Sequence, residues 1–311
     1  MTQTKITGAV VQTGSLLFDL QGTIEVFSAK LNEAAKLGAD LVVFPEAFIG
    51  GYPKGHDFGA RVGSRTSDGR DVFARYFASS LALDSQEFRQ ISKAVKSANL
   101  HVVVGVIERA GGTLYCTILY FDASGQLTGK HRKLMPTAME RLIWGFGDGS
   151  TMDVQDWALG KTGGLICWEN YMPLARTHMY SQGVEFYCAP TVDDRVVWTP
   201  LMQTIAVEGR CFVLSAVQHM RRHHAPDEYI CAEGNAPDAV LINGGSCIIS
   251  PFGEVLAGPV FGEDCILLAE LDKTELARGK YDLDTVGHYA RPDVFQLCVD
   301  TRAKQVVTTK T

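Results

Sequence analysis

The chain contains 311 residues, of which 46% are hydrophobic and 21% are charged, and this is the composition of an ordinary globular protein. The formal net charge is −6, and the two densest basic clusters, 130–133 and 221–224, are short. The chain therefore lacks the basic surface that nucleic acid requires, and no apolar run approaches the length of a membrane span.

Strand-like and helix-like segments alternate along the N-terminal half of the chain. Apolar residues at helical spacing predict a helix over 24–35, which ends at Gly38. Residues 48–70 contain many glycines and charged residues without periodicity, and this pattern predicts a long loop. The strands predicted in this half, the last two of which form a hairpin, are 6–11, 41–44, 101–107 and 114–121.

The alternation continues through the rest of the chain. Asp84 and Glu87 have the spacing of a capping box, and the apolar stripe after them predicts a helix over 88–98. Further helices are predicted over 173–182 and 197–208. Because buried strands are mixed with hairpins and helices, the fold class is α/β. The strands predicted in this half are 165–167, 186–189, 212–217 and 246–250.

The domain organisation follows from what the sequence lacks. No linker rich in Pro, Gly or Ser interrupts the alternation, so we expect a single domain over residues 1–280. Residues 281–311 are irregular, and we expect them to form a C-terminal arm or tail that takes part in assembly. Residues 1–14 lack the basic start and long apolar stretch of a secretory signal.

Cysteines and histidines are spread in a way that argues against disulfides and metals. The eight cysteines include no Cys-x-x-Cys pair, and this favours free thiols in a reducing cytoplasm. His219, His223, His224 and Cys231 share one segment, but no His-Glu-x-x-His motif is present, so we predict no metal site. Residues 125–130 imitate a phosphate-binding loop that is one residue short, and they predict a turn and a strand instead.

Reactive side chains follow three of the predicted strands. Glu46 comes just after the buried strand 41–44, Lys133 lies in the segment HRKLMP, and Cys167 closes a short strand. A cysteine between a strand and a helix exposes its sulfur at the helix N-terminus, where the dipole and the unpaired N–H groups favour the thiolate. A nearby lysine would favour the thiolate further, and a nearby carboxylate would act as general base.

Each of these residues also has a plain structural interpretation. A free cysteine is usually a small buried hydrophobic residue, and this is our interpretation of most of the other seven. Glu46 alone would serve as a cap for the following turn, and Lys133 alone would be a solvated cation. Together, however, the three residues supply a nucleophile, a base and a cation, so their combination favours catalysis.

Five longer stretches, which include these residues, resemble a known family. They resemble the nitrilase branch of the carbon–nitrogen hydrolase superfamily, and they are most like the plant and bacterial aromatic nitrilases. The similarity extends over nearly the whole chain. The stretches are LVVFPEAFIGGYPKG (41–55), GKHRKLMPTAMERLIWGFGDGS (129–150), GGLICWENYMPLAR (163–176), YCAPT (187–191) and VGHYARPDVF (286–295).

The resemblance implies a four-layer α-β-β-α sandwich without a metal or an organic cofactor. It implies that the chain hydrolyses small organic nitriles to carboxylic acid and ammonia, with some amide as a by-product. It also implies a homo-oligomer built from dimers, which in many members of the family extends into a larger helical assembly. The segment 220–239 is individual to this chain, so the preferred nitrile is left open.

The roles of single residues are likewise carried over from the family. The resemblance implies that Cys167 attacks the nitrile, that Glu46 is the general base and that Lys133 stabilises negative charge. It implies that Glu140 is a second carboxylate, which pairs with Lys133. For Trp198, core packing of the predicted helix is the alternative to a place in the substrate pocket. The residues expected to line that pocket are Tyr52, Trp168, Pro190, Thr191 and Trp198.

Two alternative functions stay open at this point. An amidase or carbamoylase of the same superfamily shares Glu46, Lys133 and Cys167, although the longer signature at 168–170 favours a nitrilase. A non-enzymatic binding or scaffold protein that kept the fold is the other alternative. The intact set of reactive residues, including Glu140, argues against it.

Overall fold

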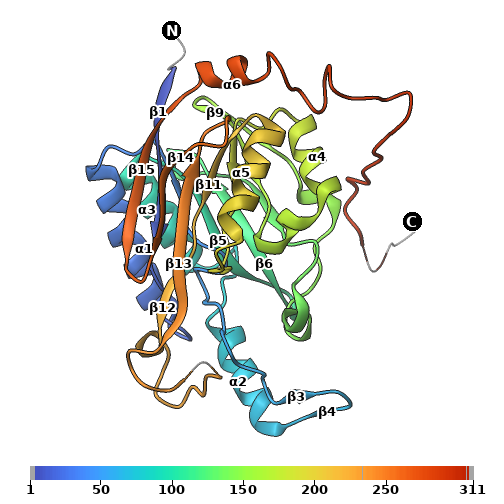
Figure 1. Ribbon diagram of the computed structural model, residues 1–311. Helices are drawn as coiled ribbons and strands as arrows, with labels where there is room; N and C mark the ends of the chain where they lie inside the picture. Colours follow the sequence, from blue (N-terminus) through green and yellow to red (C-terminus); the bar gives the residue numbers. More distant parts are fainter. Residues whose placement is uncertain (1–3, 233, 306, 308–311) are drawn as a thin grey trace.

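Two β-sheets lie face to face at the centre of the molecule in the computed structural model, which describes residues 4–232, 234–305 and 307 (Figure 1). The first sheet has the strand order β15-β1-β2-β5-β6-β7. Its strands are β1 (Lys5–Gln12), β2 (Leu41–Val43), β5 (His101–Ala110), β6 (Thr113–Phe121), β7 (Leu127–Arg132) and β15 (Cys265–Asp272).

The second sheet has the order β12-β13-β11-β10-β9-β8, and β14 pairs with β13. Within it β10 lies parallel to both β9 and β11, as β2 lies parallel to β1 and β5 in the first sheet. Its strands are β8 (Gln155–Trp157), β9 (Gly160–Gly164), β10 (Phe186–Cys188), β11 (Phe212–Ser215), β12 (His219–Arg221), β13 (Val240–Ile249) and β14 (Val255–Phe261).

Helices cover the outer face of each sheet. The helices α1 (Leu20–Lys36) and α3 (Gln86–Ala98) pack on the first sheet, and α4 (Pro173–Ser181) and α5 (Trp198–Gly209) pack on the second. Apolar cores lie between the two sheets and beneath each helix pair. The predicted four-layer α-β-β-α sandwich is therefore confirmed. None of the helices in the described part of the chain is long and apolar enough to cross a membrane.

Smaller elements complete the fold. The hairpin β3 (Ala60–Arg61) and β4 (Ser64–Arg65) precedes α2, which projects from the lower side of the body in Figure 1. The remaining elements are α2 (Ser67–Ala78), α6 (Thr274–Gly279) and the 3-10 turns η1 (Ala138–Leu142), η2 (Gly149–Thr151), η3 (Cys167–Tyr171) and η4 (Arg222–His224).

The predicted loop over 48–70 is wrong at its C-terminal end. The side chain of Thr66 accepts a hydrogen bond from the N–H of Gly69, and the helix α2 begins at Ser67. This helix buries only Gly69 and Tyr76, so its sequence lacks the apolar stripe from which a helix is predicted. The expected capping box at Asp84 is also wrong by one residue. The cap of α3 is Ser85, whose hydroxyl accepts from the N–H of Phe88.

Residues 281–305 contain no helix or strand and leave the body beyond α4, as the red trace in Figure 1 shows. The end of this segment returns to the body, where the N–H of Lys304 donates to a carboxylate oxygen of Asp148 over 2.8 Å. The domain boundary near residue 280 and the role of the arm in assembly stay predictions.

Candidate active site

Glu46, Lys133 and Glu140 form one buried cluster of charges. The Nζ atom of Lys133 lies 2.7 Å from Oε1 of Glu46 and 2.8 Å from Oε2 of Glu140. The buried Cys167 lies against this cluster, where its thiol influences the pKa of both Glu46 and Lys133. The structure thus brings together the four residues that were predicted from the sequence to be catalytic.

The backbone at Glu46 is held against the neighbouring strand. A Cβ atom at Gly105 on β5 would lie 2.3 Å from the carbonyl oxygen of Pro45, so only glycine lets the two segments approach so closely. The side-chain amide of Gln218 donates to the carbonyl oxygen of Glu46 over 2.8 Å. The next residue, Ala47, has a φ of +50°, a strained value that turns the chain sharply after the carboxylate.

Lys133 and Glu140 are connected through the turn between them. Lys133 follows the last residue of β7, and its N–H donates to the carbonyl oxygen of Cys116 on β6. The carboxylate of Glu140 accepts from the N–H of Thr137 at one oxygen and from the hydroxyl of Tyr52 at the other, over 2.6 Å and 2.9 Å. Glu140 therefore has a fixed position beside Lys133.

Cys167 begins the turn η3, and the strand before it ends at Gly164, three residues earlier than predicted. A Cβ atom at Gly164 would lie 1.8 Å from the carbonyl oxygen of Cys188, so this strand packs tightly against β10. Cys167 has a φ of +49°, and its N–H donates to the carbonyl oxygen of Pro190. The side-chain amide of Asn170 donates to the carbonyl oxygen of Cys167 and fixes the turn.

Glu169 ties the lysine segment to the cysteine segment. One of its oxygens accepts from the N–H of Leu134 over 2.7 Å, and the other accepts from the N–H of Ile166 over 2.8 Å. The ring of His131 lies 3.0 Å from the same carboxylate. Burial acts to raise the pKa of Glu169, but His131 and these hydrogen bonds hold it below its usual range. The sequence analysis did not assign Glu169 this bridging role.

The protonation of the cluster differs from the sequence-based expectation. Burial raises the pKa of the Cys167 thiol well above its usual range, and Glu46 raises it further, while Lys133 only partly opposes them. Burial and the neighbouring carboxylate therefore oppose the thiolate that the sequence pattern favours, and η3 is too short for a strong helix dipole. Burial acts against the charge of Lys133, but Glu46 and its neighbours hold the pKa of this amine well above its usual range.

Glu46 has the properties of a general base. Burial raises the pKa of its carboxyl group, and the charge of Lys133 partly opposes that effect. Its Oε1 atom accepts from Lys133, whereas its fully buried Oε2 atom has no hydrogen-bond partner within the described part of the chain. A resting thiol therefore lies beside a carboxylate oxygen that is able to take up its proton.

A sequence profile of carbon–nitrogen hydrolases matches residues 7–281. The chain belongs to the carbon–nitrogen hydrolase family. It is 56% identical to a nitrilase of Bradyrhizobium diazoefficiens, over 97% of this chain and 94% of the relative. It is 52% identical to an aliphatic nitrilase of Sinorhizobium fredii over 99% of both chains. These similarities confirm the resemblance to nitrilases that the sequence analysis found.

A plant relative and two solved structures are also similar to this chain. A bifunctional nitrilase/nitrile hydratase of Nicotiana tabacum is 50% identical over 97% of this chain and 88% of its own. Among solved structures, the Caenorhabditis elegans NitFhit protein superposes with a TM-score of 0.74 and 17% identity, over 98% of this chain and 70% of that chain. A Nesterenkonia amidase superposes with a TM-score of 0.65 and 17% identity, over 88% and 92%. Both structures share the family's fold.

A cavity of about 190 Å³ reaches the thiol of this carbon–nitrogen hydrolase. Tyr52 and Trp168 line it, as the sequence analysis expected. Pro190 and Thr191 instead lie behind the nucleophile: the carbonyl oxygen of Pro190 holds the N–H of Cys167, and Thr191 is fully buried. Pro190 therefore positions the cysteine turn, and neither residue is among those that line the cavity.

Trp198 lies outside the cavity, which corrects the expectation that it limits substrate size. Its side chain is 1% exposed and packs in the core between α5 and the second sheet. Its indole N–H donates to the hydroxyl of Ser215 over 2.8 Å. The alternative interpretation, core packing of the predicted helix, is the one the structure supports.

Two residues that hold Trp168 at the mouth of the cavity, Asp193 and Arg195, were not predicted from the sequence. The indole N–H of Trp168 donates to a carboxylate oxygen of Asp193 over 2.8 Å. The guanidinium group of Arg195 lies 4.9 Å from the centre of the indole ring and also pairs with Asp193. Their position could have indicated them, because Asp193 and Arg195 follow Thr191 beyond the carboxyl end of β10, where ligands bind in parallel sheets.

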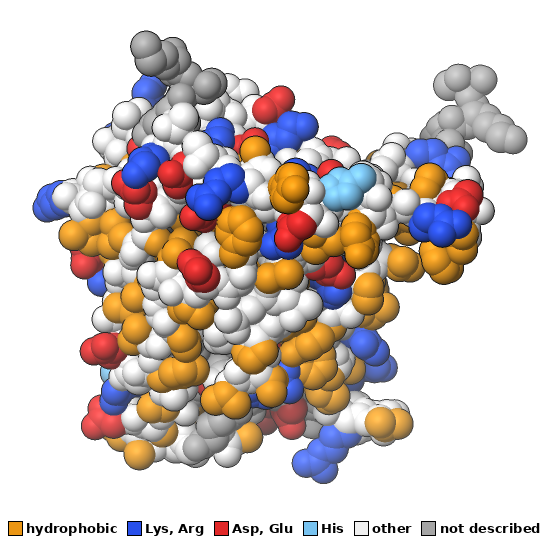
Figure 2. All heavy atoms as spheres, turned by 45° about the horizontal axis from the view of Figure 1, so that its top comes forward, with side chains coloured by type: hydrophobic (Ala, Val, Ile, Leu, Met, Phe, Trp, Pro, Cys, Tyr) orange, Lys and Arg blue, Asp and Glu red, His pale blue; other side chains and the backbone are white. Residues whose placement is uncertain are grey.

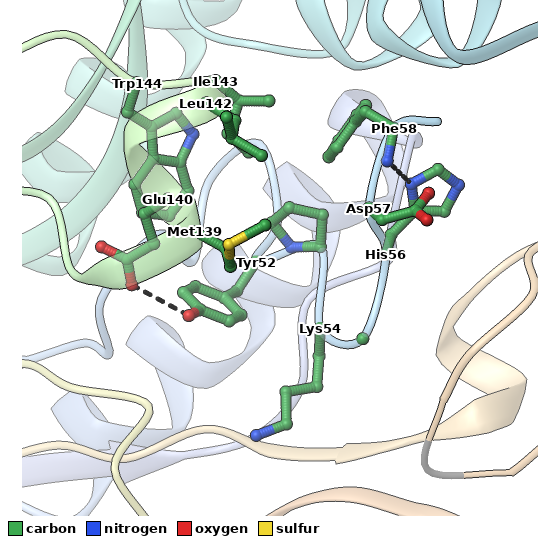
Figure 3. Close-up of a pocket in the computed structure, with 12 residues that line it drawn as sticks. Tyr52, Lys54, His56, Asp57, Phe58, Met139, Glu140, Leu142, Ile143 and Trp144 are labelled. Carbon is green, nitrogen blue, oxygen red and sulfur yellow. Dashed lines mark hydrogen bonds between the residues drawn. The ribbon is translucent and has the colours of Figure 1, made fainter. Parts of the chain in front are cut away.

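A second cavity, of about 360 Å³, adjoins the first (Figure 3). The two share Tyr52, Lys54 and Glu140 as common walls, and Figure 3 shows the hydroxyl of Tyr52 directed at the carboxylate of Glu140. The other walls are mostly apolar and come from the loop around Phe58 and from η1 and the residues after it. The side chains that η1 and the residues after it contribute to this cavity are Met139, Leu142, Ile143 and Trp144.

The histidine-rich segment serves a structural purpose. His219 lies 2.6 Å from the carboxylate of Asp264, and Nδ1 of His224 accepts from the N–H of Arg221. Within the part of the chain that the structure describes, no group of three or more His, Cys, Asp or Glu side chains is arranged to hold a metal ion. The phosphate-loop imitation at 125–130 forms a turn followed by β7, as predicted.

Proposed function

We propose that this carbon–nitrogen hydrolase is a nitrilase, which converts an organic nitrile into a carboxylic acid and ammonia through a covalent bond to Cys167. The observation that carries the proposal is the buried thiol of Cys167 beside Glu46, whose Oε2 atom has no partner among the described residues, with Lys133 held by two carboxylates. The 56% identity to a nitrilase over nearly the full length supports the choice of nitriles within the family.

The first step forms a thioimidate. Glu46 takes the proton of the Cys167 thiol as the sulfur attacks the nitrile carbon. One π bond of the C≡N group breaks, and the nitrogen receives the proton from Glu46. The N–H of Trp168 makes no hydrogen bond among the described residues, so it is available, together with Lys133, to stabilise the negative charge that develops.

Hydrolysis then proceeds in two stages. Glu46 takes a proton from a water molecule, whose oxygen adds to the thioimidate carbon, and the proton passes to the nitrogen. Glu46 then passes the proton of the new hydroxyl group to the nitrogen, the C–N bond breaks as the C=O bond forms, ammonia leaves and a thioester stays on Cys167. A second water molecule, activated in the same way, adds to the thioester, and breakage of the C–S bond releases the acid and restores the thiol.

The tetrahedral species formed after the first water adds has a second route. If its C–S bond breaks before its C–N bond, an amide leaves in place of ammonia. The tobacco relative is named a bifunctional nitrilase/nitrile hydratase, and this name supports some amide release here. We assign Glu140 the task of biasing the choice, because its carboxylate contacts Lys133 and the hydroxyl of Tyr52.

The two cavities suit two parts of one substrate. The reacting carbon would lie in the smaller cavity beside Cys167, and the organic group would extend past Tyr52 into the larger, apolar one. A volume of about 360 Å³ lies within the range of roughly 300–1,000 Å³ that is usual for ligand pockets.

An amidase or carbamoylase is the competing function, since such enzymes share the same three reactive residues. Purified enzyme should be assayed with phenylacetonitrile and phenylacetamide under the same conditions. We expect turnover of the nitrile, with an amide turnover that is much slower. Hydrolysis of the amide without hydrolysis of any nitrile in a panel of about a dozen would contradict the proposal.

We also propose that the chain assembles into a homo-oligomer with a dimer as the building block, which extends into a larger helical assembly. Large apolar side chains are exposed on α4, before α5 and along the arm, where Figure 2 shows orange groups near the grey end of the chain. Examples are Leu174, Val196, Tyr281 and Phe295, which are 67%, 78%, 90% and 79% exposed. Light scattering coupled to size-exclusion chromatography would show a single subunit mass if the proposal is wrong.

A reducing cytoplasm is the compartment we propose. No disulfide joins the eight cysteines within the part of the chain that the structure describes, and six of them are buried in the fold. Secreted domains usually pair their cysteines, whereas cytosolic thiols stay reduced. Fractionation of the source cells would test this location.

A further inference from the structure

Cys116 is a second thiol that contacts the reaction centre. It lies on β6 in the core between the two sheets and is 1% exposed. Its sulfur lies 3.5 Å from Oε1 of Glu46, to which the S–H group donates. Its carbonyl oxygen accepts the N–H of Lys133 over 2.8 Å. One residue therefore holds the side chain of the base and the backbone of the neighbouring cation.

The contact occupies one oxygen of the carboxylate and leaves the other open. Oε1 of Glu46 accepts from both Cys116 and Lys133, whereas Oε2 has no partner among the described residues. With both donors on the same oxygen, the carboxyl group cannot rotate without losing two hydrogen bonds. The geometry therefore selects Oε2 as the atom that exchanges protons.

We propose that Cys116 is a positioning residue for Glu46: its S–H group and Lys133 together orient the carboxylate and stabilise its charged form. The inference rests on the proposed function only in requiring that Glu46 deprotonates Cys167. No substrate contact is assigned to Cys116, since neither cavity beside the reaction centre includes it.

Cys116 has the protonation that a donor needs. Burial raises the pKa of its thiol well above the usual range, and the charge of Glu46 raises it further, so the S–H group persists at neutral pH. A thiol is a weak donor, so its effect on the carboxylate is smaller than that of the lysine. The ionisable groups that face Glu46 from the surrounding elements are Lys133 after β7, Glu140 on η1, Cys167 on η3, Cys116 on β6 and Tyr52 on the loop after β2.

The test measures how the alkylation of Cys167 by iodoacetamide depends on pH, followed by mass spectrometry of its peptide. This readout needs no nitrile turnover, so it tests the inference even if the substrate is not a nitrile. In Cys116→Ala and Cys116→Val the donor is lost, the carboxylate of Glu46 is less stabilised and its pKa rises. We expect the acid limb of the alkylation profile to move to higher pH by about half a unit, or about threefold in rate at a fixed pH on that limb.

Cys188→Ala is the matched control. Cys188 is another fully buried free thiol of the core between the sheets, but its sulfur makes only a 4.0 Å contact with the carbonyl oxygen of Phe186. We expect it to lose stability as Cys116→Ala does while keeping the wild-type profile. Cys116→Ser keeps a donor, so its acid limb should lie closer to that of the wild type than the limb of Cys116→Val.

Two results would overturn the inference. The first is an acid limb in the Ala and Val variants that coincides with that of Cys188→Ala. The second is an equal shift in the Ser and Val variants, which would assign the effect to packing rather than to the hydrogen bond. Because valine fills the space of the thiol, Cys116→Val decides the matter if Cys116→Ala does not fold. The kcat/KM profile for phenylacetonitrile, measured separately, tests the nitrilase function itself.

Discussion

The buried centre and the rim of the cavities are built in opposite ways. Glu46 and Lys133 are at most 1% exposed, and short hydrogen bonds connect them to each other and to Cys116, Glu140 and Gln218. At the rim, Met139, Leu142 and Trp168 are 65%, 53% and 42% exposed. A change at the centre therefore breaks a network, whereas a change at the rim alters only local shape. We therefore assign the reaction to the buried centre and the choice of substrate to the rim of the cavities.

Strained backbone is found close to the reactive residues. Ala47, Ala138 and Cys167 have φ values of +50°, +45° and +49°, and they lie next to Glu46, two residues before Glu140, and at the nucleophile itself. Each such conformation costs on the order of 1–3 kcal/mol, which the surrounding hydrogen bonds must offset. These strained conformations thus lower the stability of the fold, and they hold the side chains of the centre in one arrangement.

The largest effect is expected from Cys167→Ala. Removal of the nucleophile should reduce nitrile hydrolysis by about 10⁵-fold or more, while this small change at the first residue of η3 leaves the Tm within a few degrees of the wild-type value. Steady-state kinetics and thermal unfolding measure the two quantities. Steady turnover by the purified variant at even one-tenth of the wild-type rate would break the assignment of Cys167.

Glu46→Gln should have the next largest effect, because an amide cannot accept the proton of the thiol. We expect a loss of roughly 10³-fold in kcat/KM. In the wild type, burial raises the pKa of Glu46 above its ordinary value of 4.5. Since the carboxylate is the active form, kcat/KM should fall as the pH drops through that raised pKa. An acid limb centred below 4.5 would argue that another group acts as base.

Glu140→Gln should change the product more than it stops the reaction. A bias of about 1.4 kcal/mol in the collapse of the tetrahedral species shifts the acid-to-amide ratio tenfold. We expect lower activity with a larger share of amide, measured chromatographically from one nitrile, beside Glu46→Gln. If the two variants have equal residual activity and equal product ratios, the proposed division of labour between the two carboxylates is wrong.

The smallest effect is expected at the rim. Leu142→Ala should change the ratio of kcat/KM for phenylacetonitrile to that for propionitrile by about fivefold, because it removes apolar contact from the larger cavity. Trp198→Ala is the control, since it should cost about 3–5 kcal/mol of stability and leave this ratio unchanged. If Trp198→Ala changes this ratio of kcat/KM values and Leu142→Ala does not, the assignment of Leu142 to the substrate cavity and of Trp198 to the core is wrong.

The reactive residues were predictable because strand ends are visible in a sequence. Short apolar runs that stop before Glu46 and Cys167 place both at the edge of a sheet, and the resemblance supplied Lys133 and Glu140. The protonation of Cys167 was not predictable, since it depends on burial and on a carboxylate from a distant segment. A pattern can indicate that a thiol follows a strand, but not what surrounds it.

The surroundings of two other residues, Trp198 and Cys116, could not be predicted from the sequence for the same reason. Trp198 begins an amphipathic helix, and periodicity does not say whether an aromatic side chain faces the core or a cavity. Cys116 lies among apolar residues of a strand, so its sequence context is that of an ordinary core position. Its contact with Glu46 joins residues that are 70 positions apart in the chain, and only the folded arrangement brings it about.

The most direct test of the account is a search for the covalent intermediate. Wild-type enzyme saturated with phenylacetonitrile should be quenched in acid within milliseconds, digested and analysed by mass spectrometry. We expect that the peptide containing Cys167, and none of the other cysteine peptides, carries the added mass of a thioimidate or thioester, and that the adduct decays as acid appears. Product formation with an adduct on a different cysteine, or an undiminished burst of product by Cys167→Ala, would contradict it.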